Sequence, residues 1–152
     1  MRKRTRIGLA ALIAAALAAV WLMLSPGWAL AAMRNAAKAK DAQRVAGYVD
    51  ATAVKRSITE QIAAQMAFAQ TSKGAIDPAV AELAMRDARR MGETLEPARI
   101  VMGMLAAPVD PVIDRTGLRT FIAGPKESDG GLEFELQGVT WRVVGIRPPN
   151  KP

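Results

Sequence analysis

The chain has 152 residues and a formal net charge of +7, and it contains no cysteine and no histidine. The two missing residue types exclude disulfide frameworks, thiolate zinc sites, cysteine nucleophiles and every catalytic arrangement that pairs histidine with serine or cysteine. Apolar residues make up 51% of the chain, which excludes global disorder. The length suits a membrane anchor followed by one domain with a modest core.

The positive charge is concentrated at the N-terminus. Arg2, Lys3, Arg4 and Arg6 precede a hydrophobic run, and subtracting them from the total leaves an excess of +3. The remainder has no basic stripe of the kind that nucleic-acid-binding domains carry. We therefore interpret the charge as a topology signal, with residues 1–6 as a basic cytoplasmic end, and expect no nucleic-acid partner.

The next segment is uncharged from Ile7 to Leu24, a run of 18 residues. As a helix it spans about 27 Å at ~1.5 Å per residue, close to the ~30 Å hydrocarbon core of a bilayer. Trp21 and Trp28 mark its far end, where interfacial aromatic residues gather. We expect residues 7–25 to form a transmembrane anchor in the lipid bilayer, and Ser25-Pro26-Gly27 to end the helix.

A cleaved signal peptide is the competing interpretation, because Ala29-Leu30-Ala31 offers a small-residue cleavage site. We favour an uncleaved signal-anchor, since the run is longer than a usual signal core and cleavage would cut into the next helix. Basic residues flank the span equally, four on each side, so a plain count does not orient it. The preceding cluster abuts the span, which favours a domain outside the cytoplasm. The four that follow are Arg34, Lys38, Lys40 and Arg44.

Three helices are expected directly after the anchor. The first runs from Trp28 to Lys40, and Asp41 caps a short second helix. Asp50 caps a longer third helix, in which apolar residues recur every four positions. These residues are Val54, Ile58, Ile62 and Met66, and the segment 71–74 ends the helix.

Further helices are predicted up to residue 124. Asp77-Pro78 begins a helix, because a capping residue precedes proline at the first helical position. Its expected buried face holds Val80, Leu83, Ala84 and Met91. Glu96-Pro97 begins the next helix, and Thr116 caps a last short one that carries Leu118, Phe121 and Ile122.

From Leu132 the apolar period changes to two, which predicts a β-hairpin. A two-residue turn at Gln137-Gly138 pairs Leu136 with Val139, Phe134 with Trp141 and Leu132 with Val143. This register puts all six apolar side chains on one face and sets Glu133 opposite Arg142 on the other. An isolated hairpin is marginal in water, so its apolar face should pack on the helices.

Enzyme signatures are missing: the sequence has no phosphate-binding loop, nucleophile elbow or dinucleotide fingerprint. Asp110 and Asp114 stand four positions apart and suggest a carboxylate pair, although the start and end of a short helical turn explain them better. We expect no catalytic residues, no metal site and no cofactor.

One charged cluster remains as a candidate interaction site. Arg86, Arg89 and Arg90 share a helix and would suit an anionic headgroup or an acidic partner, with a solvated helix face as the alternative. Methionines are numerous nearby and would suit an adaptable groove or ordinary core filling. They are Met85, Met91, Met102 and Met104.

Several short motifs occur in a recognisable order. They are Ser25-Pro26-Gly27-Trp28-Ala29-Leu30, Met33-Arg34-Asn35-Ala36, Tyr48-Val49-Asp50, Gly117-Leu118-Arg119 and the segment 138–148. This order resembles the small bacterial proteins grouped as domain of unknown function 2939. The resemblance implies a secreted or membrane-anchored protein with a helical N-terminal half and a strand-bearing C-terminus, and it implies no activity. Similar proteins carry more strand-forming sequence before the final hairpin, so we expect no larger curved sheet here.

Together these observations predict an α+β protein: an N-terminal transmembrane helix, a single soluble domain over residues 26–147 and a flexible tail at 148–152. The domain should be mostly helical, with a C-terminal antiparallel β-hairpin packed on the helices. We expect a single-pass protein of the bacterial inner membrane whose periplasmic domain is a non-enzymatic module for an unknown protein or small ligand. The alternatives are a small-ligand carrier or enzyme with a pocket between hairpin and helices, and a cytoplasm-facing adaptor. An apolar pocket with a buried, unpaired acid or arginine would favour the pocket alternative, and a solid core would favour the interaction module.

Overall fold

The computed structural model describes residues 2–70 and 78–149, and the side chains among them apart from those of residues 2–10 and 70. The helices come first: α1 (Arg2–Lys38), α2 (Ala42–Ala46), α3 (Ala51–Gln70), α4 (Pro78–Glu93) and α5 (Pro97–Ala106). The strands follow: β1 (Val112–Arg115), β2 (Thr120–Gly124), β3 (Gly131–Gln137) and β4 (Thr140–Arg147). They form an antiparallel sheet in the order β1-β2-β3-β4, which confirms the α+β class with its C-terminal hairpin.

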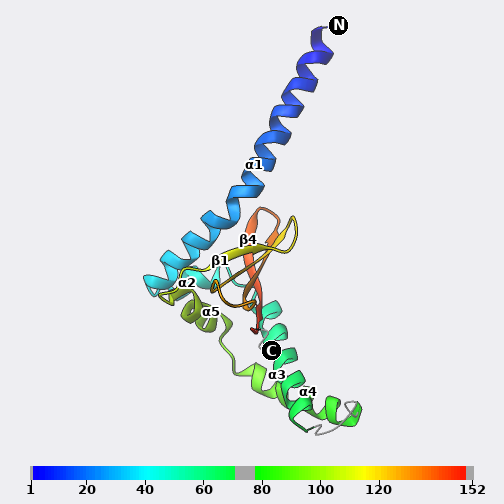
Figure 1. Cartoon of the computed structure of the whole chain (residues 1–152), viewed down its shortest axis with the longest axis vertical. Helices are drawn as coiled ribbons and strands as arrows, with labels where there is room; N and C mark the ends of the chain where they lie inside the picture. The colour runs from blue at the N-terminus through cyan, green and yellow to red at the C-terminus, as the bar shows by residue number, and fades with distance from the viewer. Residues whose placement is uncertain (1, 71–77, 150–152) are drawn as a thin grey trace.

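Helix α1 is one long helix whose N-terminal part projects away from the rest of the molecule (Figure 1). Within the described residues, the segment 11–38 is long and apolar enough to cross a membrane, with a mean hydropathy of 1.8 in its most apolar window. A signal sequence near the N-terminus meets the same criterion. The helix therefore suits either a membrane anchor or a signal sequence.

The expected helix end at Ser25-Pro26-Gly27 is wrong, because α1 continues through Pro26 to Lys38. Proline has no N–H for the carbonyl four residues before it, which here belongs to Leu22. Other groups satisfy that carbonyl: the Ser25 hydroxyl donates to it at 3.5 Å, and the Arg115 guanidinium donates to it as well. Arg115 also donates to the Met23 carbonyl at 3.2 Å. Contacts from the domain thus stabilise the helix where its own ladder is broken.

The two predicted aspartate caps are confirmed. Asp41 accepts a hydrogen bond from the Arg44 amide at 2.9 Å, and Asp50 accepts one from the Ala53 amide at 3.0 Å. Asp50 also accepts from the side-chain amide of Gln137 at 3.1 Å, so the cap ties α3 to the β3–β4 turn. These hydrogen bonds, the one from Ala53 first, hold the pKa of Asp50 below its ordinary value.

Helices α3 and α4 form an antiparallel pair that extends away from the sheet (Figure 1). The predicted buried face of α4 is partly wrong, since Leu83 and Met91 are 48% and 53% exposed. Ala84 is buried as predicted, and the other buried positions are the small residues Ala88 and Gly92. Small side chains let the two helices approach closely, which an apolar pattern weighted by large residues does not reveal. The expected helix end at 71–74 and the capping residue at 77 lie outside the described residues.

The helix predicted to start at Thr116 is also wrong. Residues 112–124 form strands β1 and β2, joined by a turn in which the Thr116 and Gly117 amides donate to the Thr120 carbonyl at 3.3 and 3.2 Å. Strand β2 is buried at four positions in succession, so it shows no alternation between apolar and polar residues. The hairpin is therefore the second half of a four-stranded sheet, larger than we expected.

The β3–β4 hairpin forms, but its turn lies one residue later than predicted, which shifts the pairing along β4 by two residues. Leu136 pairs with Trp141 and Phe134 with Val143, so the two central turn residues are Gly138 and Val139. Gly138 has a φ of +65°, which glycine adopts without strain and which two-residue hairpin turns require. Val139 consequently lies in the turn and is 78% exposed instead of paired. Beyond Phe134 the register shifts, which sets Glu133 opposite Gly145.

The core lies between the sheet and the helices. The Phe121 and Phe134 rings stack at 4.4 Å, and the Trp141 ring meets Phe121 edge-on at 4.9 Å. Buried aliphatic residues from the helices complete the cluster. They include Met33 of α1, Val54 of α3 and Val101 and Leu105 of α5.

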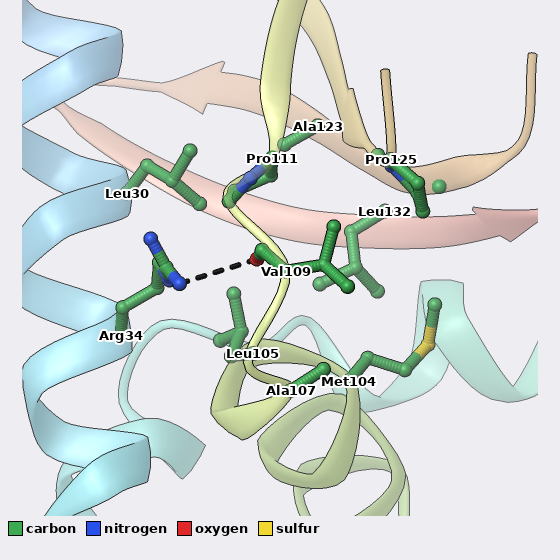
Figure 2. A pocket seen from close by; sticks show the side chains of 12 residues that line it. Leu30, Arg34, Met104, Leu105, Ala107, Val109, Pro111, Ala123, Pro125 and Leu132 are labelled. Atoms are coloured by element: carbon green, nitrogen blue, oxygen red, sulfur yellow. Dashed lines mark hydrogen bonds between the residues drawn. The ribbon is translucent and has the colours of Figure 1, made fainter. Parts of the chain in front are cut away.

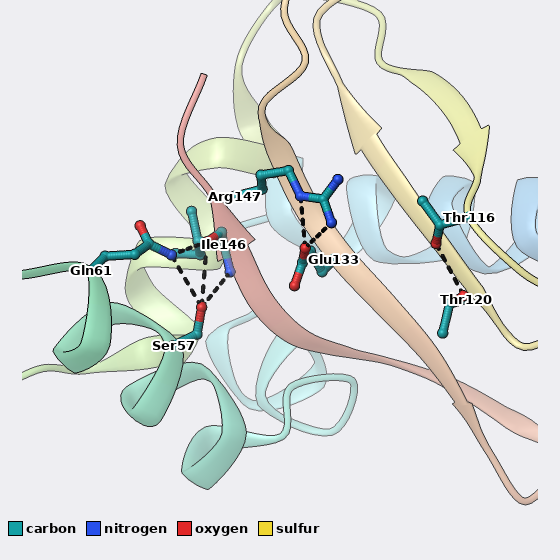
Figure 3. Close-up of polar contacts among 7 residues, drawn as sticks. All are labelled: Ser57, Gln61, Thr116, Thr120, Glu133, Ile146 and Arg147. Atoms are coloured by element: carbon teal, nitrogen blue, oxygen red, sulfur yellow. Dashed lines mark hydrogen bonds and ion pairs between the residues drawn. The ribbon is translucent and has the colours of Figure 1, made fainter. Parts of the chain in front are cut away.

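The outer edge of β4 is covered, which protects that edge of the sheet from pairing with another chain. In Figure 3, Ser57 and Gln61 of α3 reach the end of β4. The Ile146 amide donates to the Ser57 hydroxyl at 3.3 Å, and the Gln61 side-chain amide donates to the Ile146 carbonyl. On the neighbouring strand, Glu133 forms an ion pair with Arg147 at 2.7 Å. The contacts of Ser57 and Gln61 fix α3 against the sheet, and the ion pair joins β3 to β4.

Candidate functional site

A cavity of about 220 Å³ opens between α1, α5 and one end of the sheet (Figure 2). Its walls come from α1, α5, the segment that links α5 to β1, and the adjacent ends of β2 and β3. The lining residues are Leu30, Arg34, Met104, Leu105, Ala107, Val109, Pro111, Ala123, Gly124, Pro125, Gly131 and Leu132. Arg34 is the one charged side chain in this lining; the others are apolar.

The local structure explains why these walls meet. Leu30 and Arg34 are four residues apart on α1 and therefore share one face of the helix. At the opposite wall, Gly124 and Gly131 bring the ends of β2 and β3 into close contact. A Cβ at Gly124 would overlap the Gly130 carbonyl, and a Cβ at Gly131 would overlap the Ala123 carbonyl. Glycine at both positions thus permits the narrow end of the pocket.

The size of the cavity limits what it can hold. It is larger than the engineered cavity of ~150 Å³ that binds benzene, and smaller than the ~300 Å³ at which pockets for drug-sized ligands begin. A single ring or a short acyl chain fits this volume. Met104 is 40% exposed at the rim, and its unbranched side chain can adapt to a ligand.

Arg34 brings a positive charge to this apolar wall. Its side chain is only 17% exposed, and its NH1 donates to Asp110 at 2.9 Å. Its NH2 donates to the Val109 carbonyl at 3.2 Å, a bond drawn in Figure 2. Its Nε is buried and has no hydrogen-bond partner among the described residues. The guanidinium therefore holds an unused donor in a desolvated position.

Asp110 is the partner that balances this charge from the solvent side. Its side chain is 95% exposed, so the ion pair joins a buried cation to an exposed anion. The hydrogen bond from Arg34, and then the charge of Arg34, hold the pKa of Asp110 below its ordinary range. Since exposed carboxylates are well hydrated, another anion can replace Asp110 on the guanidinium at little cost.

The three predicted arginines lie elsewhere, on the α3–α4 pair. Arg86 is exposed and pairs with Glu82 at 3.4 Å, one turn away on the same helix. Arg89 lines a shallow groove between α3 and α4 together with Lys55 and Arg56. Arg90 is exposed. The structure thus places the three side chains on the solvent side of α4 and away from the pocket.

The carboxylate pair considered for Asp110 and Asp114 does not form on a helix. Asp110 binds Arg34, and Asp114 lies in β1 opposite Ile122. An extended chain separates residues four apart by about 13 Å, farther than the carboxyl pairs of glycosidases.

Sequence reasoning did not single out Arg34, which was counted only among the charges that flank the span. One signal was present. Leu30, Met33 and Ala37 form the buried stripe of α1, and Arg34 lies within that stripe. A charged residue inside an apolar stripe is costly unless it is paired, so such a position indicates a built contact.

Residues 15–114, about two thirds of the chain, match the model of the family described as protein of unknown function (DUF2939). The chain belongs to this family. The resemblance inferred from the short motifs is thereby confirmed. The DUF2939 match includes the α1 and α5 walls of the pocket, whereas strands β2 to β4 lie beyond it. No curated protein and no solved structure gives a significant match.

Proposed function

We propose that this DUF2939 protein is a membrane-anchored envelope protein that binds a small ligand with an apolar body and an anionic group. The ligand would occupy the pocket between α1, α5 and the sheet. The observation that carries this proposal is the buried, unpartnered Nε of Arg34 in a wall that is otherwise apolar. An apolar pocket with a buried, unpaired arginine was the feature expected of a ligand-binding protein, and Arg34 meets it in part, since its Nε is unpartnered while its NH1 and NH2 are bonded.

The energetics support an anionic ligand. A buried donor without a partner costs roughly 1–3 kcal/mol, and more when the group is charged. A ligand carboxylate or phosphate that accepts from Arg34 would remove this penalty, while the apolar walls contribute through burial of its hydrocarbon part. A ligand without an acceptor would leave the penalty in place. The pocket should therefore discriminate by charge as well as by size.

The lining supports binding and not catalysis. General acid–base chemistry needs a group that titrates near neutral pH. Among the described residues that line the pocket, Arg34 is the sole ionisable side chain, and arginine stays protonated. We therefore assign the pocket to capture or transport of a ligand, with no chemical step.

Retention of the N-terminal helix is supported by its packing. Ser25, Pro26 and Leu30 are buried against the domain, and Trp141 donates to the Ser25 hydroxyl at 2.9 Å. Cleavage after Ala31 would remove all of these contacts and the Leu30 wall of the pocket. A helix used in this way by the folded domain suits an anchor better than a discarded signal sequence.

The basic cluster that abuts the span supports a cytoplasmic N-terminus and a periplasmic domain. The pocket then lies close to the bilayer. Leu30 and Arg34 follow Leu24, the last strongly apolar residue before Ser25-Pro26-Gly27, by six and ten residues. At ~1.5 Å per residue this is about 9–15 Å along the helix, within reach of an amphiphile leaving the membrane surface.

The test is a titration of the full chain in nanodiscs, with hexanoate and hexanol as matched probes. Both are six-carbon chains, and only hexanoate carries the anion. At roughly 0.5 kcal/mol per heavy atom, such small probes should bind in the millimolar range. We expect hexanoate to bind more tightly than hexanol, measured by ligand-observed NMR.

Three variants make the test specific. Arg34→Gln should weaken hexanoate binding by at least about tenfold, the effect of one charge-assisted hydrogen bond, and leave hexanol nearly unchanged. Ala107→Leu should weaken both probes, because the larger side chain fills the cavity. Arg86→Gln, an exposed arginine on α4, is the control and should change neither. Equal hexanoate binding by the wild type and Arg34→Gln would refute the proposal.

A further inference from the structure

Two turns lie side by side at one end of the sheet. In an antiparallel sheet of order β1-β2-β3-β4, the β1–β2 and β3–β4 turns are at the same end, and the β2–β3 turn is at the other. Figure 1 shows the first two turns on the side of the domain from which the N-terminal part of α1 projects. We refer to residues 115–120 and 137–142 as the two proximal turns.

Direct contacts fix the height of the proximal turns along α1. Arg115, where the first turn begins, donates to the carbonyls of Leu22 and Met23. Trp141, at the end of the second, donates to the Ser25 hydroxyl at 2.9 Å. Leu22 and Met23 belong to the last turn of the expected membrane anchor, residues 7–25. The proximal turns therefore sit at the level where the apolar span ends.

The proximal turns differ in composition from the opposite end of the same sheet. They expose two large apolar side chains, Leu118 at 77% and Val139 at 78%. They contain three arginines and no acidic residue. These arginines are Arg115, Arg119 and Arg142. The opposite turn, residues 125–130, carries one lysine and two acidic residues and no large aliphatic or aromatic side chain.

Hydrogen bonds hold both proximal turns in place, and in the second turn the Gln137 side-chain amide donates to Asp50 at 3.1 Å. The Thr116 hydroxyl donates to the Thr120 hydroxyl at 3.0 Å, as Figure 3 shows. Arg119 donates from its guanidinium to the Leu136 carbonyl at 2.7 Å, which links the first turn to β3. The exposed apolar side chains thus project from ordered turns, at a fixed position relative to α1.

We infer that the proximal turns dip into the lipid–water interface beside the anchor. Leu118 and Val139 then reach the upper part of the acyl chains, and the arginines contact the phosphate groups of the lipid heads. The inference rests on the membrane anchor of the proposed function, and it adds a second membrane contact through the soluble domain. Interfacial apolar groups are buried ~5–10 Å into this boundary, and flanking arginines bind anionic lipids.

A bilayer is favoured over a protein partner because the surface is continuous with the span. A protein partner would have to approach the turns at the depth where lipid headgroups already surround α1. The charge agrees as well, since the two turns themselves carry three arginines and no acidic residue, which complements phosphate; the nearest acid across the sheet, Glu135 opposite Arg142, lies in β3 outside the turns. Phe68 provides the contrast: it is equally exposed, at 78%, but lies near the end of α3, far from the projecting part of α1 (Figure 1).

The test uses single cysteines, which the natural chain lacks entirely. Leu118→Cys and Val139→Cys are labelled with the fluorophore NBD in the full chain, reconstituted in vesicles of phosphatidylcholine and phosphatidylglycerol at 3:1. Phe68→Cys is the matched exposed control, and Ala15→Cys reports on the anchor itself. We expect labels at 118 and 139 to show blue-shifted emission and severalfold stronger quenching by a lipid with a nitroxide on its acyl chain than the label at 68.

The outcomes separate the two claims. Strong quenching at 15 together with emission at 118 and 139 that matches position 68 would overturn the interfacial contact and leave the anchor intact. Absence of quenching at 15 would overturn the anchor, and the interfacial contact with it. Strong and equal quenching at positions 68, 118 and 139 would also overturn the inference, because the membrane contact would then not be specific to the proximal turns.

Discussion

The hydrogen bond between Trp141 and Ser25 offers the sharpest test of how the domain is joined to α1. The indole Nε1 donates to the Ser25 hydroxyl at 2.9 Å, and the two residues are 3% and 6% exposed. Ser25→Ala removes the acceptor and leaves the buried indole N–H without it. A buried donor without a partner costs roughly 1–3 kcal/mol, so we expect the free energy of unfolding to fall by about 2 kcal/mol.

Urea unfolding of the full chain in nanodiscs measures this loss, with near-UV circular dichroism reporting the aromatic core. For a domain of this size the dependence on urea is about 1.5 kcal/mol per molar, so a loss of 2 kcal/mol lowers the midpoint by about 1.3 M. The slope should stay unchanged, because the variant exposes no additional surface on unfolding.

A double-mutant cycle with Trp141→Phe isolates the bond. Phenylalanine has no N–H, so Ser25→Ala should cost less than half as much in that background. The cycle also cancels the weaker bond from the Ser25 hydroxyl to Leu22, which is lost in both backgrounds. An equal cost of Ser25→Ala with and without the indole N–H would refute the reasoning.

Three further predictions test other parts of the structure. Gly124→Ala should lower the free energy of unfolding in urea by about 1–3 kcal/mol, because the added Cβ would overlap the backbone of β3 and the turn before it. Gly103→Ala is the control: its Cβ would enter open space, so it should raise the free energy of unfolding by ~0.5–1 kcal/mol. Equal effects of the two variants would contradict the close approach of the strands. Asp110→Asn should strengthen hexanoate binding severalfold and leave hexanol unchanged, because the carboxylate competes for Arg34; unaltered hexanoate affinity would contradict this. Asp50→Asn keeps the helix cap and removes the titrating group. Because the pKa of Asp50 is lower in the folded state than its unfolded value of about 3.9, the stabilisation by its charged form is complete above that value and is lost as the pH falls through the folded pKa. The urea midpoint of the wild type should therefore exceed that of Asp50→Asn at pH 5, and this difference should shrink as the pH falls to 2. A difference that stays constant with pH would contradict a lowered pKa of Asp50 in the folded state.

Features set by neighbouring residues were predictable from the sequence. The uncharged run marks the apolar part of α1, the aspartates at 41 and 50 cap their helices, and Pro97 begins α5. Each depends on interactions within about four residues along the chain, such as a side chain that accepts from a nearby amide. The existence of the C-terminal hairpin was also predictable, because its period-two pattern depends only on which face is buried.

The register of that hairpin was not predictable in the same way. Turns at residues 137–138 and at 138–139 both contain Gly138, and both leave apolar residues paired across the strands. The choice depends on packing: Phe134 stacks on Phe121 of β2, and Trp141 reaches Ser25 of α1. Strand β2 itself was missed because four of its five residues are buried in succession, so it shows no alternation.

The sequence by itself therefore determined the helix caps, the apolar span and the presence of a hairpin, because those depend on local bonds and on solvent. Only the tertiary structure decided how α1 continues through Pro26 and what Arg34 does. The first requires Arg115, a residue 93 positions away, to satisfy the Leu22 carbonyl. The second requires α5 and the sheet to close an apolar wall around a guanidinium whose Nε then lacks a partner. Such contacts join segments distant in the chain, and a local pattern, such as a charged residue within the apolar stripe of α1, does not identify their partners.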